Sequence, residues 1–492
     1  MADLSHIELD LGSDTPLYKQ LADSIRTLVE RGSIEAGERL PATRELAGLL
    51  GLNRTTISSA YALLEEAGLL EGHVGRGSFV AKKFRTAGTE TMDWEALLPP
   101  VGPLLSAGDS VTVSFANSRP SEEAFPLAQF RRLSKQVVDS PEASGILQLG
   151  SPHGYAPLRR FLLGQAAGHG IAHSGDDLII TNGCQQALDL IARLFAPGKD
   201  LVALEDPVYH GLLRVFMRAG AKIVSIPVDG AGVNVDALRV TVEQHRPRIL
   251  VVTPSFQNPT GVTLPLERRK RIVDIAQRFG VVLVENDIYS DLRYRGKALP
   301  TLKELDDSGQ TILLRSYSKI SFPGLRVGWV IAPRPVVARL ADVKQISDLH
   351  SDQLSQAILL RFAESGELDR HLDRTRRAGL ERLNAVLEAC ERYLPAGSKF
   401  TRPEGGMNLW VELPAPLTAA RLLAATQERG VNFLPGPYFA DGRGHERGLR
   451  ISFGGLTPEQ IKFGIQILGQ AAAAELAARA NPANLEAAAA LV

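Results

Sequence analysis

The sequence predicts a multidomain protein, in which a small and mainly helical N-terminal domain precedes a larger α/β domain built on a mostly parallel sheet. Its 492 residues exceed what one hydrophobic core usually organises. Seven short apolar runs lie between residues 178 and 331 and alternate with helical patterns. The runs are continuously apolar, as expected for parallel strands that helices cover on both faces. Upstream of residue 80, apolar residues instead recur at steps of three and four, which indicates short helices.

The composition is that of an ordinary globular protein, with 44% hydrophobic and 22% charged residues. The 55 basic side chains balance 55 acidic ones, so the net charge gives no sign of a polyanionic partner. The two cysteines, Cys184 and Cys390, fit no metal-binding spacing, and we expect no metal. The sequence lacks an apolar signal core, and no apolar run reaches the roughly 18 residues of a membrane helix. We therefore expect a cytoplasmic protein without a membrane partner.

The N-terminal pattern predicts a winged helix-turn-helix. Helices are expected over residues 16–31, 43–50 and 54–67, with Asn53 able to cap the third. A glycine turn separates the second helix from the third, and the glycine-rich run at residues 75–80 suits a two-stranded wing. Two helices joined by a short turn and followed by a wing are typical of DNA-binding modules.

The third helix would enter the major groove, while the second helix and the wing would contact phosphates or the minor groove. Residues 1–83 carry nine Lys and Arg against twelve Asp and Glu, so binding would depend on where the arginines lie. The alternative is a small helical module that contacts only protein. The candidate DNA-binding residues are Arg54, Thr55, Thr56 and Ser59 on the third helix, Arg44 on the second helix, and Arg76 and Gly77 on the wing.

This domain resembles the GntR-type winged helix over residues 14–81. The resemblance is carried by the segments 16–18, 37–47, 53–56 and 75–80. It implies double-stranded operator DNA as a partner. Residues 82–110 then read as a linker, since the periodicity dissolves into a stretch rich in Thr, Gly, Pro and Ser.

A lysine-containing turn at residues 314–329 organises the large domain. Lys319 lies between two apolar runs, and a buried lysine needs a partner that neutralises or bonds its amine. An imine with an aldehyde cofactor would meet that need. The hydroxyls of Ser316 and Ser318 and the guanidinium of Arg326 can hold a phosphate beside it. The plain alternative is a surface turn with a solvated lysine.

Polar motifs follow four of the apolar runs, at residues 181–187, 205–211, 253–261 and 285–291. In parallel sheets, ligands bind beyond the carboxyl ends of the strands, so the four motifs should meet near Lys319. Each motif by itself also fits a simple turn, but together they resemble fold type I pyridoxal-phosphate enzymes, the aspartate aminotransferase superfamily, over residues 111–475.

The resemblance implies pyridoxal 5'-phosphate as cofactor and a role for each motif. Lys319 would bind the aldehyde, and Arg450 would bind the α-carboxylate of a ligand through two parallel hydrogen bonds. Asn258 would bond the ring oxygen, and Tyr209 would stack on the ring. The phosphate would be held by Gly183, Cys184, Gln185, Ser316, Ser318 and Arg326.

The sequence departs from the family at the ring nitrogen. The family has an aspartate three residues before the tyrosine, whereas counting back from Tyr289 gives Asn286, and Asp287 is one residue late. Either Asp287 reaches the nitrogen or Asn286 faces it. An amide stabilises a protonated pyridine less than a carboxylate does. Both positions stay open.

The whole layout resembles the MocR-type subgroup of the GntR family. It implies a transcriptional regulator, expected to be a homodimer, whose aminotransferase-like domain senses pyridoxal phosphate or an amino-acid or amine effector. The alternative is an active aminotransferase that carries a DNA-binding domain. Residues 335–377 are expected to be a long helical stretch, and residues 476–492 an alanine-rich tail.

Overall fold

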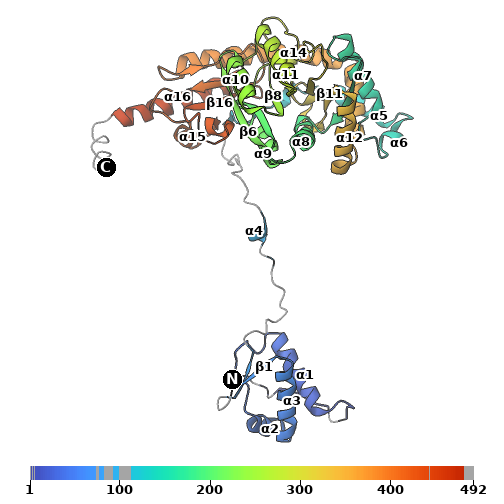
Figure 1. Ribbon diagram of the computed structural model, residues 1–492. Coiled ribbons are helices and arrows are strands. Elements are labelled where there is room, and N and C mark those ends of the chain that lie inside the picture. Colours follow the sequence, from blue (N-terminus) through green and yellow to red (C-terminus); the bar gives the residue numbers. More distant parts are fainter. Residues whose placement is uncertain are drawn as a thin grey trace. The chain divides into compact units, whose positions relative to one another are not determined.

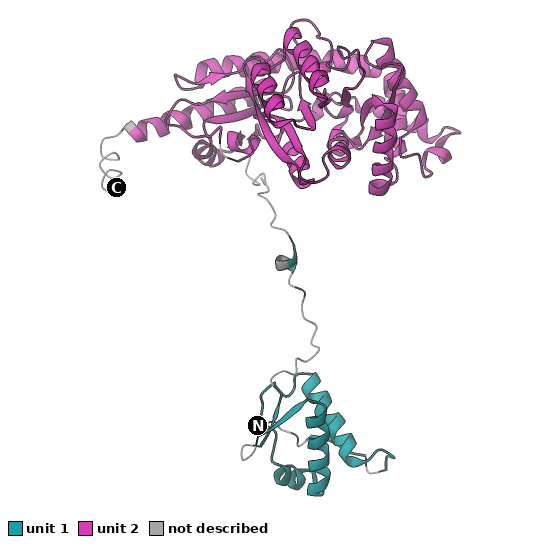
Figure 2. Cartoon of the chain, in the orientation of Figure 1, with its two compact units in different colours: residues 1–106 teal, residues 107–492 magenta. Residues whose placement is uncertain are grey.

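The computed structural model describes residues 2, 4, 6–10, 12–73, 77–81, 92, 94–98, 112–442 and 444–480. The chain divides into two compact units, residues 1–106 and 107–492 (Figure 2). Each unit is described by itself. Arg76, most of the expected linker and the end of the expected tail lie outside the described residues.

Unit 1 contains the three helices expected from the periodicity, α1 Leu17–Glu30, α2 Thr43–Leu50 and α3 Arg54–Glu66. The turn between α2 and α3 contains Gly51, whose φ of 63° favours glycine. Asn53 occupies the N-cap position of α3, but its side chain makes no capping hydrogen bond. The strands β1 Leu70–His73 and β2 Gly77–Val80 pair antiparallel and form the wing. A short helix, α4 Trp94–Leu97, also belongs to this unit.

One hydrophobic core holds unit 1 together. The inward sides of the three long helices contribute Leu21, Ile25, Leu46 and Ile57, each with no exposed surface. Val80 from the wing packs into the same cluster. The wing is therefore fixed to the helices by apolar burial and not by its strand pairing alone.

Unit 2 is built on an eight-stranded sheet with the order β4-β11-β10-β9-β8-β5-β6-β7. All seven expected strands are present, and β7, a two-residue antiparallel strand, extends one edge. The strands β10, β9, β8, β5 and β6 run parallel, while β11 is antiparallel to both neighbours. The strands are β4 Asp176–Thr181, β5 Leu201–Asp206, β6 Lys222–Asp229, β7 Gly232–Val233, β8 Ile249–Val252, β9 Val282–Asn286, β10 Ile312–Ser316 and β11 Gly328–Pro333.

Helices cover both faces of this sheet, which explains why its strands are continuously apolar. Ile312 and Leu314 pack with residues of α8 and α12 on one face, whereas Leu313 packs with residues of α7 and α13 on the other. Figure 1 labels α7, α8 and α12 beside the strands of this sheet. The helices before and between the strands are α5 Leu127–Val138, α6 Ala143–Ile146, α7 Ala156–Gly168, α8 Cys184–Phe195, α9 His210–Arg218, α10 Val235–His245 and α11 Leu266–Phe279.

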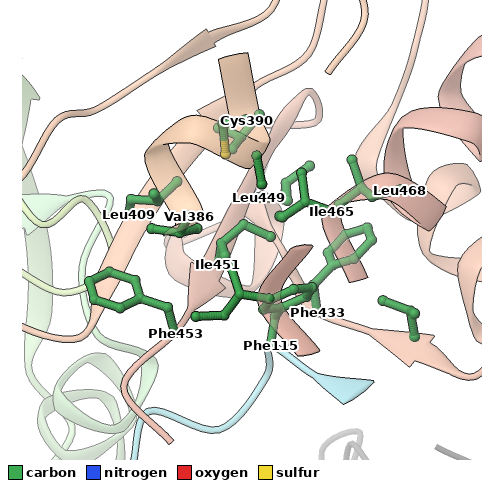
Figure 3. Packing of buried hydrophobic residues seen from close by; sticks show 14 of the residues in the cluster. Phe115, Val386, Cys390, Leu409, Phe433, Leu449, Ile451, Phe453, Ile465 and Leu468 are labelled. Carbon is green, nitrogen blue, oxygen red and sulfur yellow. The ribbon is translucent and has the colours of Figure 1, made fainter. Parts of the chain in front are cut away.

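A smaller subdomain follows the large sheet. Its four-stranded sheet has the order β12-β13-β16-β15, and the two-residue strand β3 Val113–Ser114 pairs with β14 beside it. Its separate core includes Phe115, Cys390, Phe433 and Ile451 (Figure 3). The elements are β12 Lys399–Phe400, β13 Asn408–Glu412, α15 Ala419–Gln427, β14 Val431–Asn432, β15 Leu434–Pro435, β16 Gly448–Ser452 and α16 Pro458–Ala480.

The expected long helical stretch is made of three helices, α12 Arg334–Asp348, α13 Gln353–Glu364 and α14 Glu367–Tyr393. The first break has Leu349 at a φ of 57° and Asp352 capping α13. The second has Gly366 at a φ of 71°. At the other end, α16 continues into the expected tail as far as Ala480. None of the helices in the described ranges combines the length and apolar character needed to cross a lipid bilayer.

Candidate functional site

The exposed side of α3 carries most of the residues predicted to contact DNA. Arg54, Thr55 and Ser59 are exposed there, and Thr56 is half-buried. Arg44 is exposed on α2. Neither arginine has a side-chain partner within the described residues. Both guanidinium groups are thus available to phosphates or base edges.

The inward side of α3 fixes the position of this surface. Ile57 and Leu64 are fully buried, and the Tyr61 hydroxyl donates a hydrogen bond of 2.8 Å to the Pro41 carbonyl. Pro41 lies just before α2, so this bond ties α3 to the entry of the preceding helix. A fixed pair of helices is what a helix-turn-helix needs to place side chains in a groove.

The wing contributes one described candidate, Gly77. It is exposed, has a φ of 101°, and a Cβ there would lie 3.2 Å from Nε of Arg39. Glycine thus allows Arg39 to cover the start of β2. Arg76 lies outside the described residues, and its contact with DNA stays a prediction.

In unit 2, the residues predicted to hold a phosphate gather between the start of α8 and the turn after β10. The Ser318 N–H donates to Ser316 Oγ at 3.0 Å, and Arg326 Nη1 donates to Ser318 Oγ at 3.3 Å. Arg326 Nη2 donates to the Asn182 carbonyl at 3.2 Å. Because α8 begins at Cys184 with free N–H groups, hydroxyls, a guanidinium and a helix N-terminus converge on one anion site.

Glycines allow this close approach. Gly183 has φ 78° and ψ 173°, a conformation practically restricted to glycine. A Cβ on Gly183 would lie 2.5 Å from Arg326 Nη2, and a Cβ on Gly328 would lie 2.9 Å from the Gly183 backbone. A side chain at position 183 would therefore displace the guanidinium of Arg326.

The side chains of Cys184, Gln185 and Tyr209 are engaged outside the anion site. Cys184 Sγ donates to the Arg315 carbonyl at 3.4 Å, and Gln185 Nε2 donates to the Gly211 carbonyl at 3.2 Å. The first two residues would thus serve a phosphate through their backbone N–H groups. Tyr209 is 38% exposed at the start of α9, where its ring packs over Gly211.

Lys319 ends a 3₁₀ turn, Tyr317–Lys319, directly after β10. Its Nζ donates a hydrogen bond of 2.5 Å to the Ser118 carbonyl and lies 5.8 Å from the centroid of the Tyr289 ring. No acidic side chain of the described part of the chain forms an ion pair with it. An amine held by a carbonyl and an aromatic face stays free to condense with an aldehyde.

Arg450, Asn258 and Tyr289 form a linked group beside Lys319. Arg450 Nη1 donates to Asn258 Oδ1 at 3.0 Å, and Asn258 Nδ2 donates to the Tyr289 hydroxyl at 3.4 Å. Arg450 Nη2 donates to the Ala116 carbonyl. Arg450 is only 3% exposed, and burial lowers the pKa of its guanidinium to about 10. Its Nε has no partner among the described residues, so a buried donor is left for a ligand.

The two candidates for the ring nitrogen have different surroundings. Asp287 accepts from Arg315 Nε at 3.1 Å and from the Ser290 hydroxyl at 2.8 Å. Asn286 Nδ2 donates to Thr253 Oγ1 at 3.3 Å, while its buried Oδ1 has no partner in the described chain. Both bonds to Asp287 end on its Oδ2, and its Oδ1 has no hydrogen-bond partner in the described chain either; of these two free oxygens, the buried one is that of the amide.

The sequence did not single out the segment 116–118, whose carbonyls bond Lys319 and Arg450. Backbone carbonyls carry no residue signature, so no pattern could have marked them. Thr253 and Glu205 were inside quoted motifs but had no assigned role. Glu205 is 2% exposed, and burial raises its pKa to about 8. A carboxylate that ends an apolar strand is the signal that could have indicated it.

The winged helix of unit 1, called the head from here on, and the site at the edge of the large sheet together define a class of protein. Members of this class are DNA-binding proteins that carry a cofactor-binding domain of the aminotransferase fold. The residues present fit pyridoxal phosphate, because an amine, an anion cradle and two unpaired buried polar atoms on Asn286 and Arg450 lie at one end of the sheet.

Known proteins support this class for both units. Residues 121–468 match the family described as aminotransferase class I and II, and residues 17–80 match the bacterial regulatory proteins of the gntR family. The chain is 30% identical to the uncharacterized HTH-type transcriptional regulator YisV of Bacillus subtilis, over 95% of this chain and 97% of the relative. It is 29% identical to the probable rhizopine catabolism regulatory protein MocR of Rhizobium meliloti, over 94% and 95%.

A solved structure matches unit 2. The α-aminoadipate aminotransferase LysN of Thermus thermophilus, complexed with N-(5'-phosphopyridoxyl)-L-leucine, is 36% identical, with a TM-score of 0.70. The match covers 75% of this chain and 94% of that structure.

The chain belongs to the MocR-type regulators, in which a GntR-type head is joined to a domain of the aminotransferase class I and II family. The expected family and fold class are confirmed. The cofactor of this domain is pyridoxal phosphate, and the GntR domain makes the chain a DNA-binding regulator.

Proposed function

We propose that the head binds operator DNA and that an amino compound, captured at the pyridoxal-phosphate site of unit 2, controls this binding. The cofactor supplies an aldehyde that condenses with amines. Lys319 would hold it, and the cradle of Ser316, Ser318 and Arg326 would bind its phosphate. Asn258 would bond the ring oxygen, and Tyr209 would lie against the ring.

The observation that carries this proposal is the pair of bonds made by the segment 116–118. The Ser118 carbonyl accepts from Lys319, and the Ala116 carbonyl accepts from Arg450. The segment follows β3, with which unit 2 begins among the described residues, and it comes after the expected linker. A cofactor on Lys319 and a carboxylate on Arg450 compete with these two hydrogen bonds. Binding at the site would therefore release the segment 116–118, which follows the linker to the DNA-binding domain.

The ligand that fits best has an amine and a carboxylate. Arg450 has a buried donor without a partner in the described chain, and a carboxylate can accept from a guanidinium at two points. The amine would condense with the aldehyde. An amino acid satisfies both requirements, whereas a plain amine leaves Arg450 on the Ala116 carbonyl.

We further propose a homodimer in the cytoplasm, where operator DNA lies. Two heads would read two half-sites, as in other helix-turn-helix dimers. The proposed division places the head at residues 14–81, the linker at 82–110, the effector domain at 111–475 and the tail at 476–492.

Binding of the full chain to DNA from upstream of its own gene tests the proposal. Fluorescence anisotropy would be measured without cofactor, with pyridoxal phosphate, and with the cofactor plus each of a panel of amino acids. We expect at least one amino acid to change the affinity several-fold. Arg450→Gln should keep cofactor binding and lose the response to amino acids. Operator affinity that is the same in every condition would refute control by the site.

The alternative function is transamination by unit 2. It is favoured by the identity to the α-aminoadipate aminotransferase and by the presence of Lys319, Asn258 and Arg450. An active enzyme predicts repeated turnover with an amino acid and a 2-oxoacid, at about 1 per second or faster. A regulator predicts binding without turnover at such rates.

A further inference from the structure

The end of β9 presents two polar side chains to opposite faces of the large sheet, since side chains alternate along a strand. Val284 packs in the core on the face covered by α8, and Asn286, two residues later, lies on the same face. The N-terminus of α8 is part of the anion cradle. Leu283 packs in the core on the other face, together with residues of α10 and α11, and Glu285 follows it there. The amide of Asn286 is therefore on the face where the cofactor site lies.

Asp287 is already paired through one of its two carboxylate oxygens, Oδ2. Its carboxylate accepts from the Arg315 guanidinium at 3.1 Å and from the Ser290 hydroxyl at 2.8 Å, with 1% of the side chain exposed. Moving Oδ2 to another partner would break this ion pair, although Arg315 would keep Asp291, whose Oδ2 lies 3.6 Å from Arg315 Nη2. Through Oδ2, Asp287 therefore ties the loop that carries Tyr289 to Arg315 of β10.

The side chain that Asn286 bonds in the described chain is uncharged. Its Nδ2 bonds Thr253 Oγ1, and the Thr253 N–H in turn donates to Glu205 Oε2 at 3.2 Å. Burial raises the pKa of Glu205 to about 8, so this carboxyl is largely protonated at neutral pH. A threonine and a neutral acid thus stand next to the amide, where a carboxylate would be needed to hold a proton on a pyridine.

We propose that Asn286 meets the ring nitrogen of pyridoxal phosphate and leaves that nitrogen unprotonated. The inference rests on the proposed cofactor site at Lys319. An amide presents a donor at one end and an acceptor at the other, and exchanging the two ends lets Nδ2 donate to the nitrogen lone pair while Oδ1 accepts from the Thr253 hydroxyl. The unpaired Oδ1 then gains its partner as well.

This arrangement suits a sensor. An unprotonated ring withdraws electrons from a bound amino compound less strongly than a protonated one. The site then captures the compound and holds it, and conversion to a 2-oxoacid is slow. Asn286 thus contacts the cofactor directly, sets the electronic state of its ring and separates binding from turnover.

Nitrogen-15 NMR tests the proposal on the full chain loaded with pyridoxal phosphate labelled at the ring nitrogen. The wild-type signal is expected at the chemical shift of an unprotonated pyridine, and Asn286→Asp should move it to the protonated position. Asp287→Asn should leave it unprotonated. A wild-type chemical shift typical of a protonated pyridine overturns the proposal, and this result does not depend on whether either variant folds. A change in the ring-nitrogen chemical shift on Asp287→Asn also overturns it.

A second readout separates this inference from the proposed function. The wild-type chain should show a visible absorbance band that depends on Lys319, whatever the state of the ring nitrogen. Absence of that band overturns the cofactor site itself, whereas a band together with a protonated signal overturns only the role of Asn286. With Asn286→Asp, conversion of amino acids in single-turnover mixing should become at least tenfold faster than in wild type, and an unchanged rate contradicts the separation of binding from turnover.

Discussion

Gly183→Ala tests the anion cradle with one methyl group. Gly183 has φ 78° and ψ 173°, and an added Cβ would lie 2.5 Å from Arg326 Nη2 and 3.1 Å from its Cζ. The methyl group must therefore push the guanidinium away from Ser318 and from the Asn182 carbonyl. We expect both a strained backbone and a weakened phosphate site.

The two effects have separate magnitudes. A residue other than glycine in this backbone region costs about 1–3 kcal/mol, which should appear as lost stability of unit 2. Displacing Arg326 removes a hydrogen bond between charged groups, worth about 1.5–3 kcal/mol. At about 1.4 kcal/mol per factor of ten, pyridoxal phosphate should bind about 10- to 100-fold more weakly.

Equilibrium titration of cofactor-free protein, followed by absorbance, measures the affinity, and thermal melting measures the stability. Gly324→Ala is the matched control, since it lies in the turn just before Arg326, has no positive φ, and its Cβ would meet nothing within 4 Å. The control should bind as wild type does. The reasoning fails if Gly183→Ala binds the cofactor within twofold of wild type.

Three further predictions address the other parts of the chain. Lys319→Ala should abolish the visible absorbance band of the bound cofactor, and a surviving band would show that the amine is elsewhere. Arg54→Ala should weaken operator binding about tenfold and reduce its salt dependence. The control Arg26→Ala removes an arginine that is paired with an acid on α1, and it should leave operator binding unchanged. If both variants lose the same affinity for the operator, α3 is not part of the DNA interface. The raised pKa of Glu205, about 8 against an ordinary 4.5, means that the folded state keeps a proton that the unfolded chain releases, so stability falls as pH rises between these values. Glu205→Gln should reduce this fall in melting temperature, whereas the exposed control Glu243→Gln should leave it unchanged; an unaltered slope in the first variant would place the titration elsewhere.

Local chemistry made much of the fold predictable. Continuous apolar runs arise only where both faces of a strand are covered, so the parallel sheet of unit 2 was visible in the sequence. The three-and-four periodicity before residue 80 gave the helices of the head in the same way. The helical stretch over residues 335–377 is present, but its division into three helices was not predicted, because the breaks at Leu349 and Gly366 depend on backbone conformations that apolar periodicity does not report.

The candidate site was predictable in part because its residues follow strand ends. That rule brought Lys319, Asn258 and Arg326 to one edge before any distance was known. It could not show that Cys184 and Gln185 turn their side chains elsewhere, since that depends on neighbours far along the chain, such as Arg315 and Gly211.

By itself, the sequence determined the two-part architecture, the family and the cofactor, because these follow from motifs whose residue types and spacing can be read directly from the sequence. Only the tertiary structure decided how the polar groups are paired. It put Asp287 on Arg315 and left the amide oxygen of Asn286 unpaired among the described residues. It also put the carbonyls of Ala116 and Ser118 on Arg450 and Lys319. The physical reason is that a buried charge or donor takes whichever partner the fold brings within hydrogen-bonding distance, and that partner can be hundreds of residues away.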